Sequence, residues 1–160
     1  STPATGTIGD YLDSSISIQY ENDVSSSHGQ STGTFYWAMY LSTDSTITTS
    51  DTQVGSDQYS SSLSSGSYRT DSLSSSTRLP SNINAGTYYW GYILDVDSDV
   101  DEASESNNVR TCDQITLQED LPDLEATSVS TSSSSATMGD TITVQYRIDN
   151  IGTDYSGSFY

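Results

Sequence analysis

The fold is decided by a short alternating stretch, TITVQY at residues 141–146. Ile142, Val144 and Tyr146 fall on one side of an extended chain, and the residues between them are polar. Apolar side chains at every second position are the pattern of a half-buried β-strand. A closely similar stretch, SISIQY, stands at residues 15–20. The chain therefore contains the same strand pattern twice.

Other landmarks recur in the same order around both stretches. They are the Gly-Asp pairs at 9–10 and 139–140, and GTFY at 33–36 with GSFY at 157–160. A repeated order of landmarks indicates an internal repeat. We expect one long copy in residues 1–120 and the first strands of a second copy in residues 121–160.

Short strand patterns separated by turn-rich segments run along the whole chain, and no helical period is sustained. Such spacing predicts an all-β protein with an antiparallel β-sandwich. We expect strands at residues 14–21, 33–42, 52–59, 66–75, 86–96, 108–118, 123–130 and 140–149.

Two of these strands are rich in aromatic residues, FYWAMY and TYYWGY. Trp37 and Trp90 are expected to face the same core and to pack there. The alternative is a platform on which a sugar ring or another surface ligand stacks, formed by Trp37, Trp90 and Tyr89.

The composition is strongly acidic, with a net charge of -18, 22 acidic residues and four basic ones, all of them arginine. A surface of this sign repels nucleic acid and anionic lipid, so neither is expected as a partner. No apolar run approaches the length of a membrane span, and no signal peptide is visible, so we expect a mature or excised segment without membrane insertion. The charge suits high solubility, high salt or divalent cations.

Several motifs in fixed order resemble the CARDB module, whose name stands for a cell-adhesion-related domain found in bacteria. They are Leu-Ser-Thr-Asp at 41–44, Pro80 followed by Gly-Thr-Tyr-Tyr at 86–89, Glu102 with Glu105 and Asn107-Asn108, Pro-Asp-Leu at 122–124, and Asn150 with Gly152. The resemblance implies an immunoglobulin-like β-sandwich. Modules of this family often stand in tandem in secreted or cell-surface bacterial proteins. The resemblance implies that the chain has no catalytic activity. It also implies an extracellular or cell-surface location.

The chain departs from the family pattern at the beginning of the first copy. Family modules open with Pro-Asp-Leu and a first strand, as at residues 122–130, whereas the first copy starts just before its second strand. An incomplete sheet edge invites a strand from another chain. We therefore expect residues from 121 onward to pack mainly against a neighbouring copy, tandem or separate, through Pro122, Asp123, Leu124, Ala126 and Val129. In the competing interpretation each module is completed by its own chain.

The most charged stretch is DVDSDVDEASESNN, residues 95–108. On an extended backbone its alternating aspartates would lie on one side, and carboxylate oxygens are the ligands that calcium prefers. The candidate ligands are Asp95, Asp97, Asp99, Asp101, Glu102 and Glu105, with Asp44 from the 41–51 loop. The stretch does not fit an EF-hand loop, because Val100 stands where a glycine is needed. The alternative is a solvated acidic loop whose side chains satisfy turn backbone groups.

Enzyme chemistry has little support in the residues. His28 is the only histidine and stands in the polar segment SSSHGQ, where an oriented catalytic base is not expected. Cys112 is the only cysteine, so it is either a small buried residue or bonded to a cysteine outside this segment.

The leading hypothesis is a non-enzymatic extracellular repeat module of an adhesin, stalk or fibre, with other copies of itself as partners. The alternative is a module that binds a surface glycan or a similar ligand.

Overall fold

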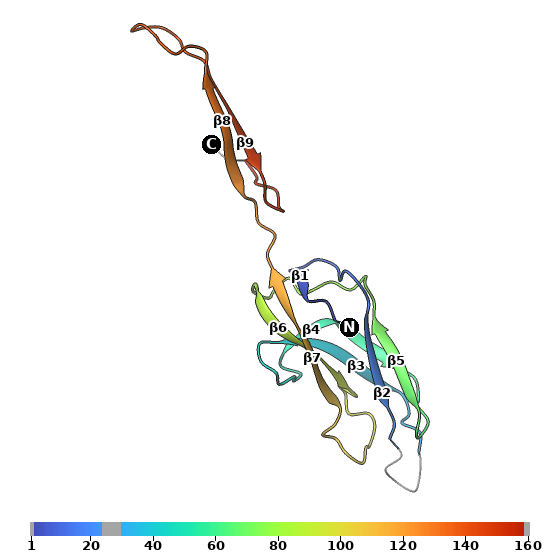
Figure 1. Cartoon of the computed structure of the whole chain (residues 1–160). Helices are drawn as coiled ribbons and strands as arrows, with labels where there is room; N and C mark the ends of the chain where they lie inside the picture. The colour runs from blue at the N-terminus through green and yellow to red at the C-terminus, as the bar shows by residue number, and fades with distance from the viewer. Residues whose placement is uncertain (1, 24–29, 159–160) are drawn as a thin grey trace. The chain divides into compact units, whose positions relative to one another are not determined.

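The computed structural model of the chain describes residues 2–23 and 30–158 (Figure 1). The chain divides into two units, Ser1–Glu119 and Asp120–Tyr160, and each is described by itself.

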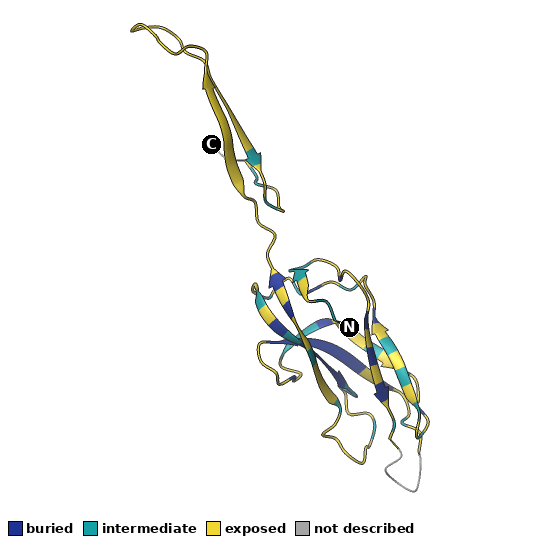
Figure 2. Ribbon diagram, in the orientation of Figure 1, coloured by how far each residue is buried: buried dark blue, intermediate teal, exposed yellow. Residues whose placement is uncertain are grey.

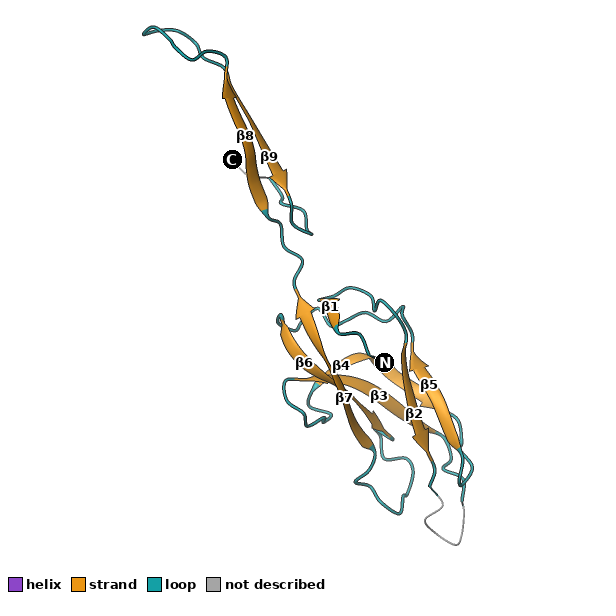
Figure 3. Ribbon diagram, viewed as in Figure 1, coloured by secondary structure: helices purple, strands orange, loops and turns teal. Residues whose placement is uncertain are grey.

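The first unit contains strands β1 to β7, and the second contains β8 and β9. Their bounds are β1 Thr5–Thr7, β2 Ile16–Glu21, β3 Phe35–Ser42, β4 Thr52–Ser60, β5 Tyr68–Leu73, β6 Gly86–Leu94, β7 Val109–Gln118, β8 Leu124–Thr131 and β9 Val144–Asn150. No helix occurs in the part of the chain that the structure describes (Figure 3). The eight strands expected from alternation are confirmed, and β1 is the strand that the sequence pattern missed.

The first unit is an immunoglobulin-like β-sandwich. One sheet has five strands in the order β1-β7-β6-β3-β4, and the facing sheet consists of β2 and β5. β1 pairs with β7 in parallel, whereas the other pairs in the two sheets are antiparallel. The all-β prediction is therefore confirmed.

The core lies between the two sheets, where the buried positions of facing strands meet (Figure 2). β2 alternates buried and exposed positions along its length, and its buried residues are Ile16, Ile18 and Tyr20. Trp37 and Trp90 are 1% and 0% exposed and belong to the same core cluster, which confirms that they face one core. The Trp90 indole N–H donates to the Pro3 carbonyl at 3.2 Å, so the chain before β1 is bound to the core residue.

The outer face of the five-stranded sheet carries a smaller apolar cluster. Ile47, from the loop between β3 and β4, packs with Ala38, Tyr40 and Ile93. The loop is held there by the Thr111 hydroxyl, which donates to the Ser45 carbonyl at 2.8 Å. Strand alternation places side chains on this face but does not predict that a loop folds over it.

Gly91 provides the space for Ile47 on this face. A Cβ at position 91 would lie 2.6 Å from Ile47 Cδ1 and 3.0 Å from the Arg110 carbonyl oxygen. Both distances are shorter than ordinary van der Waals contact, so any other residue at position 91 would push against the loop.

We expect Gly91→Ala to lower the free energy of unfolding by about 1–3 kcal/mol, as overpacking of a filled site does. In an Ile47→Ala background the same change should cost less, because the closest neighbour has been removed. Chemical denaturation of the two single variants and the double variant measures this coupling. Strictly additive losses would contradict the contact between the two positions.

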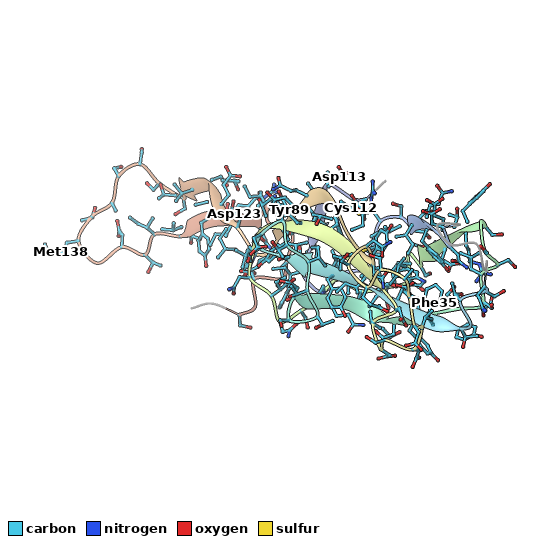
Figure 4. All side chains as sticks on the ribbon, turned by 90° about the horizontal axis from the view of Figure 1, so that it is seen from below. Phe35, Tyr89, Cys112, Asp113, Asp123 and Met138 are labelled. Atoms are coloured by element: carbon cyan, nitrogen blue, oxygen red, sulfur yellow. The ribbon has the colours of Figure 1, made fainter. Side chains whose placement is uncertain are left out.

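The second unit consists of β8 paired antiparallel with β9, with Val129 opposite Tyr146 and Thr131 opposite Val144. Its apolar side chains are exposed, among them Val129 at 74% and Tyr146 at 73%. Met138, in the loop that joins the two strands, is also exposed (Figure 4). A two-stranded antiparallel pair without a covering layer is marginally stable in water. This unit therefore presents strand material whose apolar side has no cover within the described residues.

Candidate functional site

The outer edge of β2 is the first feature that the fold leaves unfinished. β5 pairs with one edge of β2 from Ile16↔Leu73 to Glu21↔Tyr68, and no described strand pairs with the other edge. A missing first strand stays a prediction. Residues 5–7 do form a strand near the start of the chain, but β1 lies beside β7 in the facing sheet and not beside β2. A strand edge with free N–H and C=O groups can accept another strand.

A groove of about 580 Å³ runs along this open edge, between β2 and the facing strands. Ile16, Ile18 and Tyr20 line it from β2, and Tyr92 and Cys112 line it from β6 and β7. The Tyr92 hydroxyl donates to the Gln19 carbonyl at 3.1 Å. A side chain from the facing sheet thus satisfies one carbonyl of the strand that has an open edge.

A network of polar side chains connects β2 to its paired strand β5 and to the end of β4. The Tyr20 hydroxyl lies 2.6 Å from Ser60 Oγ and donates to the Asp71 carboxylate. Arg69 donates to Ser60 Oγ at 3.1 Å and to the Ser61 carbonyl at 2.6 Å. Burial raises the pKa of the Tyr20 hydroxyl, and the hydrogen bond to Asp71 raises it further, so the hydroxyl keeps its proton. These bonds connect β2 to β5 and to the end of β4.

The residues expected at an interface lie in or just before β8, and all are exposed. They are Pro122, Asp123, Leu124, Ala126 and Val129. β8 pairs with β9 of its own unit, so in this structure it is not a lone strand. Packing of these residues against a neighbouring copy stays a prediction.

The acidic stretch 95–108 turns instead of running straight, which corrects the expectation that its aspartates lie on one side. Asp95 has a positive φ of 50° and Ser98 one of 57°, and the Ser98 N–H donates to the Asp95 carbonyl at 3.0 Å. Asp95 is buried, whereas Asp97, Asp99 and Asp101 are exposed. The physical reason is the left-handed backbone at two positions, which breaks the extended geometry on which the alternation argument depends.

Backbone groups and side chains of the same loop occupy several of its carboxylates. Asp95 accepts from the N–H groups of Asp99 at 2.9 Å and Val100 at 3.1 Å. Glu105 accepts from the Glu102 N–H at 2.9 Å, and Glu102 accepts from the Asn108 side chain at 2.5 Å. Burial raises the pKa of the Glu102 carboxyl, and the bond from Asn108 opposes this shift. These contacts are those of a solvated loop that satisfies its own turns.

Asp44 is separate from this network and forms a turn of its own. Its carboxylate accepts from the Thr46 N–H at 2.7 Å. Across residues 2–23 and 30–158, no group of three or more His, Cys, Asp or Glu side chains is placed to hold a metal ion. Calcium at this loop stays a prediction that a melting experiment decides.

The aromatic platform needs a correction. The indoles of Trp37 and Trp90 are buried in the core and offer no face to a ligand, and Tyr89 is half-buried beside the Ile47 cluster. The exposed aromatic pair on the same sheet is Tyr36 with Tyr59, whose ring centroids lie 5.7 Å apart at 69°. Alternation alone does not tell which face of an aromatic strand is covered.

The sequence contains one histidine and one cysteine, and no catalytic role is expected for the histidine. His28 lies outside the described residues. Cys112 is a free, half-buried thiol on β7 beside Asp113 (Figure 4). Burial raises the pKa of the Cys112 thiol, partly opposed by the charge of Arg110, so the thiol is protonated at neutral pH.

The sequence model of the CARDB family matches residues 4–112, which is most of the first unit. The chain belongs to the CARDB family. CARDB is a non-catalytic bacterial domain family related to adhesion. No curated protein and no solved structure gave a significant match. Residues 120–160 lie outside the matched range, so a second CARDB copy there stays a prediction. Among the described residues no helix is long and apolar enough to cross a membrane.

Asp95→Asn tests how much the acidic loop depends on its buried carboxylate. An amide has only one acceptor oxygen, so one of the two N–H groups now bound at 2.9 and 3.1 Å would lose its partner. The expected loss of unfolding free energy is about 1–3 kcal/mol. Asparagine tolerates the positive φ, so the backbone is not an added cost. With both proteins measured in chelator, the exposed Asp97→Asn is the matched control and should stay within about 0.5 kcal/mol of the parent.

Calcium binding is tested by melting the protein with chelator and with excess calcium. If the loop binds calcium, chelation should lower the Tm, because ligand binding to the folded state adds stability. The double variant Asp97→Asn with Asp101→Asn should then melt at the same temperature in both conditions. Identical melting curves of the parent protein in chelator and calcium would reject a calcium site.

Proposed function

We propose that this CARDB chain is a non-enzymatic structural and adhesive module of an extracellular bacterial fibre, stalk or adhesin. Copies of the chain join head to tail by strand complementation. The observation that supports this proposal is the pairing pattern. The outer edge of β2 has no strand within the described residues, and β8 is a strand that follows the same unit.

The geometry of such a contact favours long assemblies. An acceptor edge in one unit and a donor segment in the other make a heterologous contact, and a heterologous contact that does not close on itself builds filaments. Main-chain hydrogen bonds supply the affinity in strand addition, and alternate side chains supply the specificity.

The charge of the chain sets the conditions under which copies associate. Copies that each carry a net charge of -18 repel one another at low ionic strength. Salt screens this repulsion over a Debye length of about 8–10 Å at 0.10–0.15 M. Assembly should therefore strengthen from low to moderate salt, unlike contacts that depend on opposite charges.

Sedimentation velocity and negative-stain electron microscopy of the 160-residue chain test the proposal. We expect open-ended multimers that lengthen with protein concentration and with moderate salt. A synthetic peptide of residues 122–133 should shorten them, because it occupies the acceptor edge without carrying one of its own. A scrambled peptide of the same composition is the control. A chain that stays monomeric at every concentration and salt would contradict head-to-tail assembly.

A further inference from the structure

The outer face of the five-stranded sheet carries an exposed pair of tyrosines beside two carboxylates. We propose that this surface binds an arginine side chain of a basic segment in a partner protein. We call it the tyrosine–aspartate surface, and it consists of Tyr36, Tyr59, Asp57, Asp97 and the Tyr40 hydroxyl. The proposal goes beyond head-to-tail assembly and does not depend on it, because β3, β4 and the turn after β6 supply every residue of the surface.

Strand pairing places the tyrosines on one face of the sheet. β3 and β4 lie side by side (Figure 1). Ala38 and Tyr40 of β3 belong to the Ile47 cluster on the outer face, so Tyr36, two residues before Ala38, points to the same face. Directly opposite residues of an antiparallel pair also share a face. Tyr59 of β4 stands opposite Tyr36 and therefore lies on the outer face as well.

The two carboxylates reach this face from different elements. Gln53 of β4 stands opposite Tyr40 and so shares its face, and the Gln53 side chain donates to Asp57 Oδ1 at 2.8 Å. Asp97 follows Val96, whose side chain packs on the Ile47 cluster. Both aspartates are exposed. The carboxylates therefore border the tyrosines on the outer face.

The Tyr40 hydroxyl lies near both carboxylates. Burial raises the pKa of the Tyr40 hydroxyl, and the negative charges of Asp57 and Asp97 raise it further. Coulomb interactions weaken with distance, so a hydroxyl affected by both charges has both carboxylates close by. Tyr40 is 4% exposed, and its hydroxyl has no hydrogen-bond partner among the described residues. The oxygen of this protonated hydroxyl can accept an N–H group from a ligand held between the carboxylates.

No cation of the chain neutralises this surface within the described residues. Their one side-chain ion pair joins Arg147 to Asp149 in the second unit. Arg69 and Arg78 donate to backbone carbonyls of other segments. Arg110, the fourth arginine, lines the groove along β2. The surface therefore has negative charge without a cationic partner in the part of the chain that the structure describes.

Arginine is the cation that fits both the rings and the carboxylates. Its planar guanidinium stacks on an aromatic ring and forms two parallel N–H bonds with a carboxylate, whereas lysine offers a point charge. The chain itself contains such a contact, since the Arg78 guanidinium lies 4.3 Å from the centroid of the Tyr11 ring. Tyr36 and Tyr59 are 39% and 59% exposed and meet edge to face, so ring surface is left for a guanidinium.

The charge of the chain favours another protein over a second copy as the occupant. A second copy brings four arginines and the same net charge of -18. Like charges oppose the approach of such a partner, whereas a basic segment is attracted to the acidic chain. Complementary charge therefore identifies the partner as a basic segment that presents arginine.

Isothermal titration calorimetry of the 160-residue chain with short peptides tests the site. The probe is Gly-Arg-Gly-Arg-Gly with acetylated and amidated ends. Two comparison peptides carry lysine or citrulline in place of arginine, and citrulline keeps nearly the shape of arginine without its charge. A Debye length of about 8 Å at physiological ionic strength screens diffuse attraction to the acidic chain. Heats are measured per chain, so the result does not depend on whether copies join.

We expect saturable binding of the arginine peptide, weaker binding of the lysine peptide and none of the citrulline peptide. Tyr59→Leu leaves the net charge unchanged and should weaken binding about two- to fivefold, which is the effect of a cation–π contact at an exposed site. Asp57→Asn should weaken binding by a similar factor. The matched controls are Tyr68→Leu on β5 and Asp13→Asn between β1 and β2, both exposed positions, and they should leave the affinity unchanged.

Three outcomes would overturn the site. The first is equal affinity for the arginine and lysine peptides, with Asp13→Asn as harmful as Asp57→Asn, because diffuse attraction then explains the binding. The second is binding of the neutral sugar cellohexaose that Tyr59→Leu abolishes, without binding of the arginine peptide. The third is no binding of the arginine peptide at all. Melting curves check the folding of each variant, and Tyr36→Leu serves if Tyr59→Leu does not fold.

Discussion

Each alternating strand of this chain must cover its apolar face, and the rest of the structure depends on this constraint. β2 meets it by placing Ile16, Ile18 and Tyr20 against a core that contains Trp37 and Trp90. Burial of such side chains contributes roughly 1.5–3 kcal/mol each. This is the main contribution that offsets the conformational entropy lost when a chain this rich in serine and threonine folds. β9 carries the same pattern without a covering layer among the described residues. The apolar face of β2 is therefore covered in the first unit, whereas that of β9 is uncovered among the described residues of the second.

Backbone pairing is a separate requirement from side-chain burial, and the two need not be met together. β2 has its side chains covered while one backbone edge stays open. β8 has one backbone edge paired while Val129 stays exposed. The two deficits are complementary, and the proposal that copies join by strand complementation rests on this observation. The Tyr20 hydroxyl is hydrogen-bonded to Ser60 and Asp71, which connects β2 to β4 and β5.

In the acidic loop, local hydrogen bonds occupy some of the carboxylates that the charge pattern suggests as cation ligands. Four aspartates at alternate positions suggest a row of cation ligands. The left-handed turn at Asp95 instead directs its carboxylate at the N–H groups of Asp99 and Val100. A buried carboxylate that accepts two backbone N–H groups is well satisfied without a cation. The remaining negative charge lies on exposed side chains, where it governs solubility and repulsion between copies.

The sequence by itself determined eight of the nine strands in the described residues, the two faces of β2, the family, and that Trp37 and Trp90 share one core. It did so because the side-chain period of a strand is local and is written directly in the alternation of residues such as Ile16, Ser17 and Ile18. Only the tertiary structure decided which edges are paired. The parallel pairing of β1 with β7 joins Thr5 to Thr116, and the folding of Ile47 onto the outer face needs the empty space at Gly91. Such pairings depend on contacts between residues far apart in the chain, and a local period contains no information about them. The same holds for the groove beside β2, since an open edge is a property of the assembled sheets and not of any one strand.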